Sequence, residues 1–105
     1  TSFGRYQVLK DFGKYLKASS SNVIISKGND ILFEQAKKNS SKNYRSAIIT
    51  AMKDIESSLK KKISDGEEDL EKIKDSSQST EKQAAILEWK TLRTGLHDKI
   101  ISIDK

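Results

Sequence analysis

The only imidazole in this 105-residue chain is His97, which stands beside Asp98 in a segment with helical periodicity. A histidine works as a general base when a nucleophile and an orienting group lie next to it. The sequence around His97 supplies neither group, which favours an ordinary histidine on a helix surface. A structural zinc site is not expected, because the chain has no second histidine and no cysteine. We therefore expect no catalytic residue, no metal and no cofactor, and predict that the protein is not an enzyme.

An acidic cluster around a glycine resembles a calcium site in composition only; its members are Asp65, Glu67, Glu68 and Asp69. A calcium loop needs ligands at alternate positions and a bidentate glutamate at its end, and this spacing is missing. Acidic residues are also common in the first turn of a helix, where they interact with its dipole. A helix start explains the cluster without a metal ion.

A run of three lysines, Lys60, Lys61 and Lys62, is the candidate basic patch. It contributes to a net charge of +5. Such a patch could contact nucleic acid, where each phosphate contact releases counterions, or an anionic membrane surface. Acidic residues interleave with lysines over most of the chain, and no aromatic residue stands within the run as a stacking platform. A solvated helix face is therefore favoured, and a nucleic-acid or membrane-surface binder is the alternative function.

The single tryptophan, Trp89, lies on an apolar seam with Leu92, Leu96 and Ile100. Tryptophan is enriched in the hot spots of protein interfaces, but it is also a large core residue. The core interpretation is favoured for Trp89. These four residues are nevertheless the candidate partner interface.

Two seams of apolar residues, spaced three or four positions apart, must position these groups. The first comprises Ile48, Met52, Ile55, Leu59 and Ile63; the second comprises Ala85, Trp89, Leu92, Leu96, Ile100 and Ile103. This spacing indicates amphipathic helices. The absence of proline, where average usage of about 5% would give roughly five, agrees with long uninterrupted helices.

The first half of the chain leaves one element open. The apolar residues within 3–18 recur at helical spacing and predict a helix, which ends at the polar stretch 19–22. Residues 23–33 allow a short β-hairpin, or a helix that begins at an Asp30 N-cap after an extended connector, Val23 to Ile25. The helix is favoured, since an isolated hairpin is marginally stable. Residues 39–43 form either a loop or the polar face of one long helix starting near Asp30.

Capping patterns predict where the later helices start. Ser64 and Glu67 have the spacing of a capping box, so a turn is expected near Gly66; if the helix instead continues, Gly66 falls on the seam, and Leu70 and Ile73 keep its register. Thr80 and Gln83 have the same spacing and are expected to open the last helix, which runs to about residue 103. Residues 65–83 contribute little to a core.

The pattern predicts an all-α protein: a small antiparallel bundle of three or four helices, with long second and last helices, forming a single domain over residues 1–105. The expected function is a non-enzymatic protein-interaction module of the adaptor, chaperone, immunity or surface-binding type. Its partner would be another protein or a second copy in a homodimer, and no small-molecule substrate is expected. No run of 18 apolar residues is present, which predicts a soluble chain, with the cytoplasm slightly favoured over secretion. The start at Thr1 suggests a processed form or an excised segment.

Overall fold

The computed structural model describes residues 2–104, with side chains described for residues 4–103. These residues form four α-helices and no strand: α1 (Ser2–Ala18), α2 (Asn22–Lys38), α3 (Lys42–Lys72) and α4 (Ser76–Asp104). The predicted all-α class is confirmed, and the alternative of a β-hairpin is not found. Thr1 and Lys105, which the predicted domain includes, lie outside the described residues.

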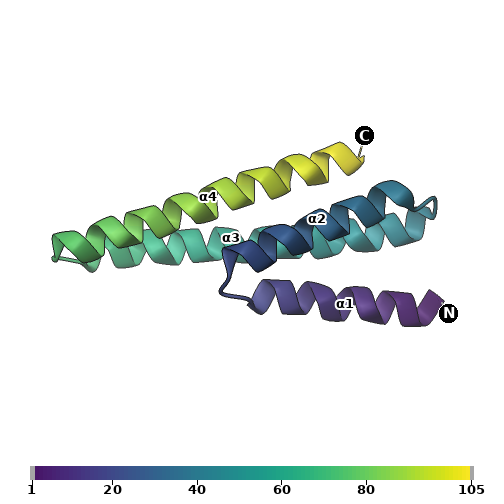
Figure 1. Cartoon of the computed structure of the whole chain (residues 1–105), viewed down its shortest axis with the longest axis horizontal. Coiled ribbons are helices and arrows are strands. Elements are labelled where there is room, and N and C mark those ends of the chain that lie inside the picture. Colours follow the sequence, from purple (N-terminus) through teal and green to yellow (C-terminus); the bar gives the residue numbers. More distant parts are fainter. Residues whose placement is uncertain (1, 105) are drawn as a thin grey trace.

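The molecule is elongated, with extents of 53 × 26 × 18 Å, and α3 runs along its length (Figure 1). Helix α4 returns along α3, while α1 and α2 cover only one half of this pair. The connection after α1 lies beside the middle of α3 and α4. There the backbone carbonyl of Ser19 accepts a hydrogen bond from Lys62 of α3, and the Asn22 side chain donates one to Glu88 of α4. Residues 63–87, which extend beyond this point, are called the arm. Within the described residues, α1 packs on α2 and α3, and no pair of Cα atoms from α1 and α4 lies within 8 Å.

The core lies where α1 and α2 cover the long pair of helices. Its buried members come from all four helices: Leu9, Leu16, Ile25, Leu32, Ala36, Ile48, Met52, Ile55, Leu59, Leu96 and Ile100. In α2 and α3 they recur at three- and four-residue spacing, which places each set on one face of its helix. Both predicted seams thus contribute to one core.

Helix α2 begins earlier than the sequence suggested, at Asn22 instead of near Asp30. The hydroxyl oxygen of Ser21 accepts a hydrogen bond from the backbone N–H of Ile24, so Ser21 is the N-cap. Once the helix includes residues 23–25, Ile25 joins the buried stripe that continues to Ala36. The prediction of an extended connector over residues 23–25 was wrong because it took Asp30, and not Ser21, as the N-cap of this helix.

Helix α3 begins after a true loop at residues 39–41 and then continues through the predicted turn. Ser41 caps it by accepting from the N–H of Tyr44, which confirms the loop interpretation of this polar stretch. Ser64 and Glu67 lie inside α3, so the capping-box prediction there was wrong. Gly66 is buried on the seam, as the continuous-helix alternative requires.

Helix α4 starts at Ser76, before the predicted capping box at Thr80. A carboxylate oxygen of Asp75 accepts from the backbone N–H of Gln78 at 3.0 Å and caps the helix. Thr80 instead donates its hydroxyl to the carbonyl of Ser76 within the helix. The two longest helices are α3 and α4, not the second and last, because residues 39–41 divide the expected long second helix.

Candidate functional site

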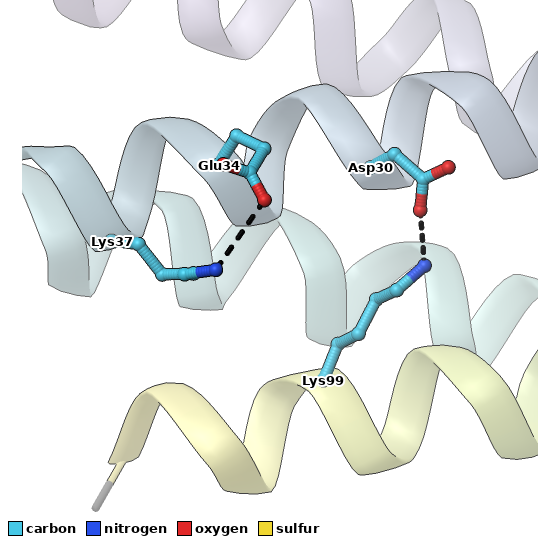
Figure 2. A network of polar contacts seen from close by, with 4 residues as sticks. All are labelled: Asp30, Glu34, Lys37 and Lys99. Carbon is cyan, nitrogen blue, oxygen red and sulfur yellow. Dashed lines mark hydrogen bonds and ion pairs between the residues drawn. The ribbon is translucent and has the colours of Figure 1, made fainter.

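A groove lies between α2 and α4, with a polar link between the two helices near each of its ends. At one end the Asn22 side chain donates to Glu88 Oε2 at 2.8 Å. At the other end Lys99 of α4 pairs with Asp30 of α2, as Figure 2 shows, while Lys37 pairs with Glu34 along α2 itself. Between these links the two helices enclose a volume of about 710 Å³ that is open to solvent.

Four apolar side chains, Val23, Leu87, Leu92 and Leu96, line this groove among polar ones. Val23 on α2 and Leu87 on α4 line it while remaining 62% and 64% exposed, respectively. Leu92 lines it too and is half-buried. Large apolar groups this exposed gain free energy when a partner removes them from water, roughly 25 cal/mol per Å². The groove therefore offers apolar surface that the chain itself leaves uncovered.

Asn29 lies in the same groove and is 1% exposed. Among the described residues, nothing forms a hydrogen bond with its Oδ1 or its Nδ2. A buried polar atom without a partner costs about 1–3 kcal/mol, so native proteins rarely keep one without a reason. The amide of Asn29 has one acceptor and two donors, which an entering molecule would reach once the side chains that cover them shift.

The groove is open partly because Gly95 has no side chain. A Cβ atom built at Gly95 meets no atom within 4 Å, although this residue lines the groove in the middle of α4. Any larger residue there would project into free space. Gly95 costs α4 up to about 1 kcal/mol of helix stability relative to alanine, and it leaves the space on its side of the groove unfilled.

The four candidate interface residues occupy different environments. Leu96 and Ile100 are buried in the core, at 1% and 3% exposure, and Leu92 is half-buried in the wall of the groove. Trp89 is half-buried against the arm portion of α3: a Cβ at Gly66 would lie 3.0 Å from its ring. Of the four, Leu92 and Leu96 line the groove, so the structure brings only part of the predicted set to one surface.

A polar cluster that sequence reasoning missed joins α3 to α4. Glu56 Oε2 accepts from Arg93 Nε at 3.1 Å and lies 3.0 Å from His97 Nδ1. The Glu56 side chain is only 10% exposed, so two bonds to one oxygen compensate for its burial. His97 thus has the orienting carboxylate that the sequence did not reveal. Among residues 4–103, no hydroxyl group bonds to the imidazole, and the arrangement is that of an interhelical clamp.

The four residues of the acidic cluster around Gly66 form ion pairs and do not open a helix. Each faces a lysine: Lys61 with Asp65 (3.0 Å), Lys82 with Asp69 (3.7 Å), Lys90 with Glu67 (3.9 Å) and Lys72 with Glu68 (3.9 Å). They lie inside α3, so the helix-start explanation was wrong. Within residues 4–103, no three metal-ligating side chains converge.

The three-lysine run does not form one surface in α3. Successive residues of an α-helix point about 100° apart, so three in a row spread around the helix. Lys61 pairs with Asp65, Lys62 donates to the backbone carbonyl of Ser19 at 3.0 Å, and Lys60 lines a separate depression between α3 and α4. The structure therefore separates the three residues of the candidate basic patch.

One signal in the sequence could have located Asn29. It lies four residues after Ile25 and three before Leu32, so a polar residue interrupts the buried stripe of α2. Residues 26–30 have the composition of a turn, so the helical spacing of Ile25, Asn29 and Leu32 was not recognised. The crossing of α2 with α4 is a tertiary feature, and the sequence pattern contains no information on it.

Within residues 2–104, no helix is long and apolar enough to cross a lipid bilayer. Comparisons with protein-family models, curated protein sequences and solved structures gave no match to this chain.

Proposed function

We propose that this protein is a non-enzymatic interaction module that binds a short helical segment of another protein in the groove between α2 and α4. The observation that carries the proposal is the conjunction of exposed apolar walls with the unpaired, buried amide of Asn29. In this proposal the chain is one domain, a small antiparallel bundle. Its helices pack against each other, and the groove faces solvent.

The dimensions and chemistry of the groove favour a helix as its occupant. Between the two polar links, α4 advances from Glu88 to Lys99, about 16 Å at roughly 1.5 Å per residue. This length matches about three turns of a bound helix. An amphipathic helix buries one apolar stripe in such a groove, and a polar side chain on that stripe would bond to Asn29.

The test is a selection of displayed amphipathic helical peptides against the whole chain, followed by affinity measurements with Gly95→Leu. Leucine at this exposed helical position fills the groove and favours the helix, so folding is retained. We expect the selected peptides to bind Gly95→Leu at least about tenfold more weakly, a loss of about 1.4 kcal/mol.

The matched control is Ser102→Leu, which adds the same side chain to an exposed position of α4 that does not line the groove. It should leave the affinity unchanged. If every selected peptide binds Gly95→Leu as tightly as the unmodified protein, the groove is not the binding site and the proposal fails.

A further inference from the structure

A second groove, lined by α1 and α3, has a different chemistry from the first. It encloses about 550 Å³, and its floor consists of small and apolar residues: Leu9, Gly13, Ala47 and Ala51. A Cβ at Gly13 would lie 3.5 Å from that of Ala51, so the two helices approach closely there. The result is a shallow apolar channel along the junction of α1 and α3.

Cations border this channel. Lys10 and Lys14 line it from α1, and Lys53 lines it from α3; all three are exposed. None of them forms an ion pair with a side chain of residues 4–103. The one acidic residue in the lining, Asp54, is neutralised by Lys17, whose Nζ lies 3.1 and 3.3 Å from its two carboxylate oxygens. The border therefore presents three unpaired positive charges.

We propose that this channel binds an acidic amphipathic helix of another protein. The apolar stripe of that helix would cover the floor, while flanking glutamate or aspartate side chains would pair with Lys10, Lys14 and Lys53. The lining spans Ala47 to Ser57 of α3, about 15 Å or nearly three helical turns. A phosphate backbone or lipid headgroups would engage the lysines alone and leave the apolar floor without a partner.

A second copy of the chain is a poorer occupant. The acidic residues of its own stretch 65–69 already pair with lysines of α3 and α4. Among the exposed large apolar side chains of the described residues, only Leu87 belongs to the arm. The arm thus has no apolar stripe beside its carboxylates to place on the channel floor. The inference is independent of the α2–α4 groove, because the two sites share no residue.

The experiment measures fluorescence anisotropy of a labelled helical peptide of about 15 residues, long enough to be helical when bound. The peptide carries a leucine and alanine stripe flanked by glutamates, and a second version has lysines in place of the glutamates. Both are titrated with the unmodified chain, with Lys10→Glu/Lys14→Glu/Lys53→Glu, and with the control Lys38→Glu/Lys42→Glu/Lys74→Glu, whose positions line neither groove. The control makes the same change in net charge at exposed positions outside the channel.

We expect the acidic peptide to bind and the lysine version to fail. The channel triple variant should weaken binding at least about tenfold, since three attractions become repulsions, and the control should change it much less. Equal losses in both triple variants, or no binding of the acidic peptide at millimolar concentration, would overturn the inference. Two other results would also overturn the inference, if the channel triple variant abolishes them. One is binding of duplex DNA or anionic vesicles when the acidic peptide does not bind. The other is a dimer of the chain detected by light scattering.

Discussion

At the scale of single residues, Asn29 connects the stability of the fold with its proposed function. It occupies a buried position on the stripe of α2, where Ile25 and Leu32 are apolar, yet its amide has no partner among the described residues. Such a group destabilises the free protein. It is useful only if a bound molecule completes its hydrogen bonds.

We therefore predict that Asn29→Leu stabilises the free protein. Leucine has the same number and branching of side-chain heavy atoms and leaves no polar atom unpaired; this gain should exceed the cost of its larger methyl groups, so the free energy of unfolding should rise by about 1–3 kcal/mol. Urea denaturation followed by circular dichroism measures the change. A decrease instead would mean that Asn29 is already satisfied in solution, for example by an ordered water, and would remove the argument that it awaits a ligand.

Between helices, the spacing of α1 and α2 depends on Gly28. A Cβ at this position would lie 2.8 Å from Cγ of Leu16 and nearer still to both of its methyl carbons. Leu16 is fully buried, so its side chain could yield only by displacing other core residues. The close approach of these helices therefore requires glycine on grounds of space, and not of backbone conformation, because its φ angle is negative.

We expect Gly28→Ala to lower the free energy of unfolding by at least about 1 kcal/mol, even though alanine favours the helix. The matched substitution Gly95→Ala meets open space and should raise stability by up to about 1 kcal/mol. Thermal denaturation of both variants provides the comparison. Equal stabilisation by the two substitutions would show that α1 and α2 are not held as closely as described.

The clamp between α3 and α4 predicts coupling between Glu56 and Arg93. Removing the carboxylate with Glu56→Ala should cost about 1–3 kcal/mol, since hydrogen bonds to charged groups are lost. In a double-mutant cycle with Arg93→Ala, each single variant loses unfolding free energy. The sum of these two losses should exceed the loss in the double variant by at least about 0.5 kcal/mol. Strict additivity would mean that the contact contributes nothing to holding the helices together.

The elements were predictable where the apolar periodicity is uninterrupted. Residues 48–63 and 85–103 have such seams, and both are helical. The starts of α2 and α4 were misplaced because several residues in each region can cap, and only the backbone geometry selects Ser21 and Asp75. The Glu56 clamp and both grooves depend on how helices cross, which the pattern of one chain does not specify.

At the scale of the whole molecule, stability is distributed unevenly along the long axis. The core cluster lies where α1 and α2 cover α3 and α4, and the arm contributes no residue to it. Toward the tip of the arm, Leu70 and Ile73 are only half-buried. Local opening should therefore begin at the tip and not in the covered half.

Hydrogen exchange measures this gradient directly. We predict that backbone amides of residues 66–80 exchange with solvent much faster than those of residues 48–59, which lie under α1 and α2. Mass spectrometry of peptic fragments resolves the two segments. Equal protection in both would mean that the arm is covered in solution, for instance by a second molecule.

The groove between α2 and α4 is proposed to bind a helical segment whose polar group pairs with Asn29. The most direct measurement is a nitrogen–proton NMR titration of the whole chain with a peptide selected as described above. We predict that the side-chain amide signals of Asn29 and the backbone signal of Gly95 shift together as the peptide is added. Saturable binding that leaves both signals unchanged while residues elsewhere shift would contradict the account.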